Sequence, residues 1–340
     1  EEAAPAAAAA PRPAAEPPPP PTPPLRPAAE TETRAVFEAG PVNPWVMADK
    51  DRLSTFAIDV DTASYSVARS YILRGYLPPP ASARMEEFVN AFDYNYPRQA
   101  ENVFSVYAEA GDSPFGRGLT LLKIGVRARV LGREARKPAH LVFVVDSSGS
   151  MALPDRMPLV QYALKALVAQ LGERDRVSLV TYGTNARLVL QTVPAADSSR
   201  IIQTIDAIQC GGSTNLLAGL RLGYETALRA FQPGGINRVV LCSDGVANVG
   251  AYDAGEILAN IDTLRRQGIS LTAAGFGAGA YNDALMEQLA DKGDGNYVFI
   301  DSAAQAERVF VEELAATIQT VAQDAKIQVE FNPGRVRRFR

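Results

Sequence analysis

Hydroxyl and carboxylate side chains gather in three short loops of this sequence. Asp146, Ser148 and Ser150 directly follow the apolar run LVFVV, Thr214 lies in a GGSTN loop, and Asp244 follows the apolar run RVVLC. In an α/β sheet, ligands bind outside the carboxyl ends of the strands, so we expect these loops at one sheet edge. A few hard oxygen ligands suit Mg²⁺, with Ca²⁺ or Mn²⁺ as alternatives. The residue types therefore predict a divalent metal site.

The elements that position these loops begin near residue 139. Short apolar runs alternate there with segments of helical periodicity, which predicts an α/β fold with a doubly wound, Rossmann-like and mostly parallel sheet. The runs 176–182 and 187–191 are separated by too few residues for a crossover helix, so we expect this pair to be antiparallel. The predicted strands are 141–145, 176–182, 187–191, 238–242, 269–277 and 296–300, and the helices are 158–171, 198–208, 216–231, 254–267, 283–290 and 303–321.

Residues 43–138 and 323–340 differ in pattern from the sheet domain and predict a smaller flanking α+β unit. The segments 102–111 and 119–132 alternate with period two and predict an antiparallel pair. Short helices are expected over 61–74 and 82–92, the first with Asp61 or Thr62 as its N-cap. We expect the alternating segment 326–331 to return to the flanking sheet.

The prolines are concentrated at one end of the chain. Twelve of the 24 lie in residues 1–42, between alanine runs and without apolar periodicity, so we expect a disordered Pro/Ala-rich linker. Extended polyproline II at ~3.1 Å per residue would reach on the order of 100 Å. A solvated tail without a specific role and a tether to a membrane anchor both remain open. Because the chain begins with Glu1, we expect an upstream segment, which leaves room for a lipid anchor.

The combination of D-x-S-x-S after a buried strand, Thr in a G-G-S-T loop and Asp after a central strand resembles the von Willebrand factor type A (VWA) domain. The resemblance covers about residues 139–322 and implies a metal-ion-dependent adhesion site (MIDAS). It implies direct ligation by Ser148, Ser150 and Thr214, and ligation by Asp146 and Asp244 directly or through water. One coordination position would stay open for the carboxylate of a protein partner.

The flanking segments carry a narrower resemblance. STFAIDVDTASY, LPPPASARMEEFVNAFDYNYP and KIQVEFNP resemble bacterial YfbK-type proteins, which have a central VWA domain. The resemblance implies a periplasmic or surface-exposed lipoprotein of the cell envelope. It also implies a C-terminal region that begins near Ile327, of which this chain contains only the start.

Composition argues against several other classes. The net charge of −4 comes from well-mixed acidic and basic residues, which does not indicate nucleic-acid binding. No apolar run of ~20 residues could span a membrane. The sequence lacks both the G-x-G-x-x-G and the G-x-x-x-x-G-K-[ST] nucleotide-binding patterns.

The single histidine weighs against catalysis. His140 precedes Ser148 by eight residues of extended chain, on the order of 25 Å, which is too far for a base and its nucleophile. We therefore predict a binding module rather than an enzyme. A metal-dependent hydrolase and a purely structural scaffold of an envelope complex are the alternatives.

Four further residues carry smaller hypotheses. Cys210 and Cys242 could form a disulfide in an oxidising envelope, although a role as small buried apolar residues is favoured. Asp59 and Asp61 could form a second metal site, although a strand end followed by an N-cap is favoured.

Overall fold

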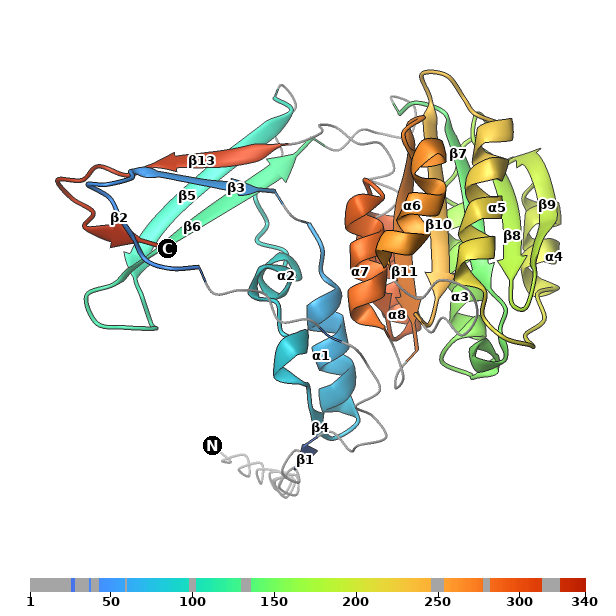
Figure 1. Ribbon diagram of the computed structural model, residues 1–340, viewed down its shortest axis with the longest axis horizontal. Helices are drawn as coiled ribbons and strands as arrows, with labels where there is room; N and C mark the ends of the chain where they lie inside the picture. The colour runs from blue at the N-terminus through green and yellow to red at the C-terminus, as the bar shows by residue number, and fades with distance from the viewer. Residues whose placement is uncertain are drawn as a thin grey trace, which may run out of the picture.

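A six-stranded sheet forms the centre of the larger part of the protein in the computed structural model (Figure 1). The strands lie in the order β12-β11-β10-β7-β8-β9, and every neighbouring pair is parallel except β8 and β9. This confirms the predicted doubly wound, Rossmann-like sheet with its antiparallel edge pair. The structure describes residues 26–27, 37, 43–58, 60–97, 102–129, 136–245, 254–277, 282–313 and 325–340. The strands are β7 (Ala139–Asp146), β8 (Arg176–Tyr182), β9 (Ala186–Pro194), β10 (Ile236–Ser243), β11 (Ile269–Phe276) and β12 (Tyr297–Ile300).

Helices cover both faces of the sheet, and a buried apolar cluster lies under each layer. All eight residues of β7 are buried, as expected for a strand between two helical layers. Gly223 lets one helix approach this strand closely, because a Cβ there would lie 2.4 Å from Val144 Cγ2. One layer holds α3 (Met157–Val168), α4 (Ser198–Asp206) and α8 (Ala303–Glu307), and the other holds α5 (Leu216–Arg229), α6 (Ala254–Arg265) and α7 (Asp283–Lys292).

The helix predicted over 303–321 is α-helical only in its first part among the described residues. Helix α8 continues directly into a π-helical segment, η3 (Arg308–Glu313), and residues 314–321 lie outside the described part of the chain. Val309 and Phe310 are buried in the same cluster as α3, so the wider turn still delivers apolar side chains to the core. None of the helices in the described ranges is both long and apolar enough to cross a membrane.

Most strands of the flanking part form two-stranded antiparallel ladders. β5 pairs with β6, which confirms the predicted pair. The prediction that 326–331 returns as a strand to the flanking part is confirmed, because β13 pairs with β3, and not with β5 or β6 (Figure 1). An alternating pattern indicates a half-buried strand but does not specify its neighbour. The ladders are β3 (Leu53–Ala57) with β13 (Lys326–Glu330), β5 (Phe104–Asp112) with β6 (Thr120–Ala128), and β2 (Val46–Met47) with β14 (Arg338–Phe339).

Only three residues of the linker predicted for 1–42 are described. Arg26–Pro27 form β1, which pairs in parallel with β4 (Tyr76–Leu77), and Phe37 packs against the buried cluster that contains α5. This part of the segment therefore contacts the folded body. The other residues of the predicted linker lie outside the described ranges, as does Asp59.

Helix α1 (Ala63–Leu73) joins the flanking part to the sheet domain. Val67 and Tyr71 belong to the same buried cluster as β12 and α7. A boundary at residue 139 therefore separates residues that share one core. The predicted end of this helix is close to the observed one, and Gly75 follows it at a φ of 84°.

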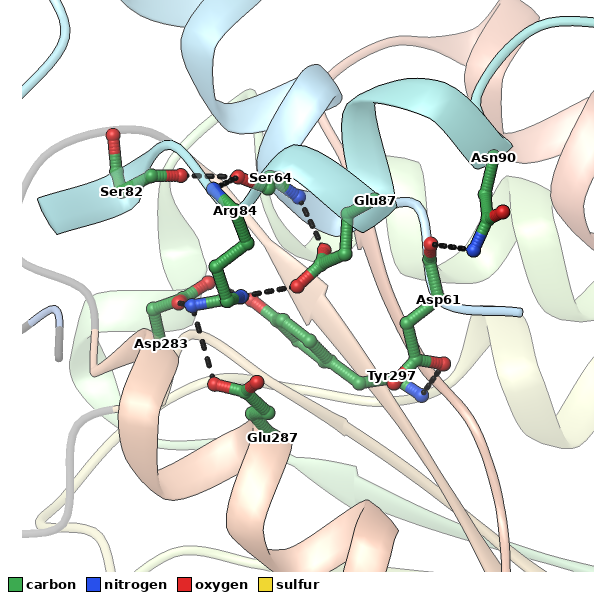
Figure 2. A network of polar contacts seen from close by, with 9 residues as sticks. All are labelled: Asp61, Ser64, Ser82, Arg84, Glu87, Asn90, Asp283, Glu287 and Tyr297. Atoms are coloured by element: carbon green, nitrogen blue, oxygen red, sulfur yellow. Dashed lines mark hydrogen bonds and ion pairs between the residues drawn. The ribbon is translucent and has the colours of Figure 1, made fainter. Parts of the chain in front are cut away.

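The position predicted for the N-cap of α1 is confirmed at Thr62, although the expected side-chain hydrogen bond is not formed. The Ser64 backbone N–H instead donates to Glu87 Oε2 at 2.7 Å (Figure 2). Asp61 Oδ1 accepts from the backbone N–H of Tyr297 at 3.1 Å. A carboxylate from α2 (Met85–Asn90) thus satisfies the helix start, and Asp61 connects the flanking part to β12.

A buried polar cluster links α2 to α7, and we call its four charged residues the Arg84 cluster (Figure 2). Arg84 Nη1 lies 2.7 Å from Asp283 Oδ2 and 3.2 Å from Glu287 Oε2, while Arg84 Nε pairs with Glu87. The Tyr297 hydroxyl donates to Asp283 Oδ1 at 2.6 Å. One guanidinium therefore serves three carboxylates. Burial raises the pKa of Glu287 to about 7, against the attraction of Arg84 and assisted by the charges of Asp283 and Glu87.

Replacing Glu287 by glutamine is expected to stabilise the protein at alkaline pH. A carboxyl whose folded pKa is raised contributes stability below its unfolded pKa and loses it as pH rises through about 7. We expect Glu287→Gln to equal the wild type near pH 4 and to exceed its free energy of unfolding by roughly 1 to 3 kcal/mol near pH 8. Urea denaturation across this pH range measures the difference. Glu307→Gln, at an exposed α8 position, should show no such divergence, and parallel curves for Glu287→Gln and wild type would refute the expectation.

Candidate metal centre

The two acidic residues of the predicted site lie side by side at the carboxyl edge of the sheet. β7 ends at Asp146 and β10 ends at Ser243, and these strands are adjacent and parallel, with Val145 opposite Cys242. Asp244 follows β10 directly. The Ser243 hydroxyl donates to Asp146 Oδ2 at 3.0 Å. Parallel pairing therefore brings the first and the last predicted ligands to the same edge, as the strand order requires.

The hydroxyls after β7 are organised by Asp146 itself. Its Oδ1 accepts from the Ser148 backbone N–H at 2.8 Å, which fixes the turn that leaves the strand. Ser148 Oγ and Ser150 Oγ lie 3.1 Å apart. The first three predicted ligands thus form one compact group of oxygens, and Ser148 and Asp146 are buried.

Backbone hydrogen bonds bring the loop with Thr214 against this turn. The Gly211 N–H donates to the Ser147 carbonyl at 2.7 Å, and the Gly149 N–H donates to the Gly212 carbonyl at 3.0 Å. Gly212 has a φ of 80°, a conformation that glycine adopts without strain. Thr214 is fully buried behind these contacts. The structure therefore gathers the three loops that carry all five predicted residues.

The electrostatics of the site favour a cation. Asp146 and Asp244 are both fully buried. Burial and, next, the charge of Asp244 raise the pKa of Asp146 to about 6. Two buried carboxylates beside three hydroxyls form an oxygen donor set that fits a hard divalent ion. Among the described residues, no group of three or more His, Cys, Asp or Glu side chains could hold a metal ion, so hydroxyl ligands are essential to this candidate.

Sequence reasoning missed one residue of this centre. Arg156 Nη1 forms an ion pair with Asp244 Oδ2 and donates to the Ser150 carbonyl at 3.1 Å. The arginine is buried at the start of α3, and a Cβ at Gly277 would lie 2.6 Å from its side chain. A cationic group is therefore already held on one candidate ligand. The available signal was an arginine directly before the helix that follows the DSSGSM loop.

His140 lies at the far end of β7 from the candidate site. Its register partners are Arg176 and Asn237, near the beginnings of β8 and β10. Its Nε2 lies 2.9 Å from Ser178 Oγ, and burial, together with the charge of Arg176, lowers its pKa to about 4. The predicted separation of this histidine from the loop serines is confirmed.

The two cysteines are free thiols in the structure. Cys242 is fully buried in the apolar cluster, which confirms the role favoured for it from the sequence. Cys210 is partly exposed and packs against the same cluster. Burial raises the pKa of both thiols, and the charge of Asp146 adds to this effect at Cys210.

Comparison with known proteins decides the family. The family model of the von Willebrand factor type A domain matches residues 140–314, more than half of the chain. The protein belongs to the VWA family. A second family model, described as von Willebrand factor, matches residues 31–123.

Curated relatives contain this VWA domain in longer chains. The Escherichia coli protein YfbK is 38% identical over 306 residues, covering 88% of this chain and 53% of the relative. The Synechocystis protein sll0103 is 25% identical, covering 62% of this chain and 49% of the relative. The magnesium-chelatase 67 kDa subunit of Chlorobaculum tepidum is 32% identical, covering 49% of this chain and 29% of the relative. The chain spans about half the length of the first two. The predicted similarity to YfbK-type VWA proteins is confirmed.

Two solved structures are among those similar to this chain. A von Willebrand factor type A protein from Catenulispora acidiphila is 19% identical with a TM-score of 0.47, covering 67% of this chain and 51% of that one. BatB from Bacteroides thetaiotaomicron is 17% identical with a TM-score of 0.44, covering 52% of this chain and 97% of that one.

Proposed function

We propose that this VWA protein is a metal-dependent protein-binding module of the bacterial cell envelope. Asp146, Ser148, Ser150, Thr214 and Asp244 would hold Mg²⁺, with Ca²⁺ or Mn²⁺ as alternatives. When bound, the ion supplies a coordination position for an Asp or Glu carboxylate of a protein partner. The observation that carries the proposal is the convergence of these five oxygen-bearing residues from three loops, with two buried carboxylates among them.

One further observation supports binding over hydrolysis. A metal-dependent hydrolase needs a general base beside the reacting water. The single histidine of the sequence lies at the opposite end of β7 and hydrogen-bonds to Ser178. One relative is by name a subunit of magnesium chelatase, which is consistent with a role in a protein assembly. A purely structural scaffold would have no need for a second buried carboxylate, Asp146, beside the ion pair of Asp244 with Arg156.

The envelope location rests on the similarity to YfbK-type proteins and on the Pro/Ala-rich composition of residues 1–25, which precede the residues that contact the folded body. Such a segment could hold the domain away from a membrane anchor. We include a lipid anchor upstream of Glu1 in the proposal. Metabolic labelling of the full-length natural protein with a radioactive fatty acid tests this part, and an unlabelled protein would contradict it.

Capture of partners from envelope extracts tests the binding function. We expect immobilised wild type to retain a set of proteins in Mg²⁺ and to release it in EDTA, because the partner carboxylate needs the ion. Asp146→Ala should retain none of this set. Asp112→Ala removes an exposed carboxylate at the end of β5 and serves as the matched control that keeps the set. Mass spectrometry compares the samples, and the same proteins on wild type in Mg²⁺, in EDTA and on Asp146→Ala would contradict the function.

A further inference from the structure

A groove of about 710 Å³ opens beside the candidate metal centre. One wall comes from β9, with Arg187 and Val189, and another from α4, with Arg200. Ser147 and Gly211, from the loops that carry the predicted ligands, also line the groove. Because Ser147 directly follows Asp146, the groove is adjacent to the candidate metal centre. Its volume lies in the range of about 300 to 1,000 Å³ that ligand sites usually have.

The groove lies on the free side of the VWA domain. β9 is the edge strand of the sheet, and β12, against which α1 packs, is the opposite edge. Figure 1 shows β9 and α4 at the end of the domain far from the flanking ladders. A partner seated here would therefore reach the metal edge without meeting the flanking part.

The charge of the groove is positive and uncompensated. Arg187 and Arg200 are exposed, and none of the described residues that line the groove is acidic. Within the described ranges, neither guanidinium forms an ion pair or a side-chain hydrogen bond. The acidic residue at the end of α4, Asp206, instead pairs with Lys165 at 2.8 Å. Other arginines of the domain do have acidic partners, as Arg156 has in Asp244.

We propose that this groove receives an acidic peptide segment of the partner whose carboxylate binds at the metal centre. The inference rests on the proposed function and adds to it the chemistry of the partner: an extended segment with further Asp or Glu residues beside the metal-binding one. Two cations next to a carboxylate-binding site would both steer and orient such a segment. Val189 and Ile208 add apolar side chains to the lining of the groove.

Peptide binding in Mg²⁺ tests the proposal by fluorescence anisotropy. The probe is a labelled synthetic peptide with one Asp followed by a run of Glu, and the reference peptide has Gln in place of each Glu. We expect the acidic peptide to bind the wild type about tenfold more tightly than the reference. Arg187→Gln combined with Arg200→Gln should abolish this difference. Arg221→Gln, at an exposed α5 arginine on the other face, should preserve it.

These measurements distinguish a failure of the proposed metal-dependent function from a failure of the groove proposal. If Asp146→Ala and EDTA leave both peptides bound as in the wild type, the proposed function fails. If binding depends on Mg²⁺ but the two peptides bind equally, or the double arginine variant keeps the difference, the groove proposal is overturned. Tighter binding of a labelled single-stranded oligonucleotide than of the acidic peptide would overturn it in favour of nucleic acid.

Cys210 gives an independent report of where the peptide lies. Its thiol lines the groove and is partly exposed, whereas Cys242 is fully buried. Saturating acidic peptide is expected to slow the reaction of Cys210 with a maleimide at least about fivefold, because the bound segment covers it. Cys210→Ser establishes the background from Cys242. An unchanged labelling rate at saturation would overturn the proposed position of the segment.

Discussion

Replacing Arg84 by methionine is expected to lower the free energy of unfolding by about 3 to 5 kcal/mol, because the change leaves buried carboxylates without their cation. The arginine side chain is 8% exposed, and those of Glu87 and Asp283 are 2% and 1% exposed. Methionine preserves much of the side-chain volume, so the lost free energy of unfolding is mainly due to the missing positive charge. Chemical denaturation at neutral pH measures it.

A matched variant tests whether the loss of stability depends on the burial of the ion pair or would follow from breaking any ion pair. Arg52, directly before β3, pairs with Glu330 of β13 at 3.1 Å, but both side chains are more than 60% exposed. Arg52→Met should therefore cost less than about 1 kcal/mol. Equal losses in Arg84→Met and Arg52→Met would contradict the role of the Arg84 cluster as the buried link between α2 and α7.

Replacing Arg156 by glutamine is expected to tighten Mg²⁺ binding about tenfold while destabilising the metal-free protein. In the structure the Arg156 guanidinium holds Asp244 Oδ2, a candidate ligand, and donates to the Ser150 carbonyl. An ion that uses Asp244 must compete with this ion pair. Glutamine removes the competing charge, and it also leaves two buried carboxylates uncompensated when no metal is present.

Calorimetric titration with Mg²⁺ and denaturation in EDTA measure these two opposite effects. Arg176→Gln changes an exposed arginine at the other end of β8 and should alter neither quantity. Weaker or unchanged Mg²⁺ binding by Arg156→Gln would show that the guanidinium does not compete at Asp244. Unchanged stability in EDTA would show that the ion pair does not compensate the buried acids.

Much of the fold could be predicted because its signals are local. The fully apolar LVFVV run and the apolar stripe over 158–171 specify a buried strand and a covering helix without knowledge of any partner. The loops of the candidate site follow from the same strands, since parallel neighbours end at one edge. The antiparallel β8–β9 pair was predictable from the short turn between its strands.

Contacts between distant segments could not be predicted in this way. Arg84 and Asp283 are 199 residues apart, and nothing in either segment identifies the other as its partner. The acceptor at the start of α1 could not be predicted for the same reason, because Ser64 N–H donates to Glu87 of another helix and not to the local cap residue Thr62. The role of Arg156 could not be predicted either, since its partner Asp244 lies 88 residues away in the sequence. Buried charges are therefore the part of this fold that sequence patterns describe least.

Mg²⁺ titration of the metal-free wild type by calorimetry, beside Asp146→Ala, tests the central claim most directly. We predict saturable binding to one site in the wild type and none in Asp146→Ala, with Asp112→Ala binding as the wild type does. Mn²⁺ detected by electron paramagnetic resonance provides the same comparison with a second ion. Equal binding by the wild type and Asp146→Ala, or no saturable binding of either ion by the wild type, would contradict a metal centre at this edge of the sheet.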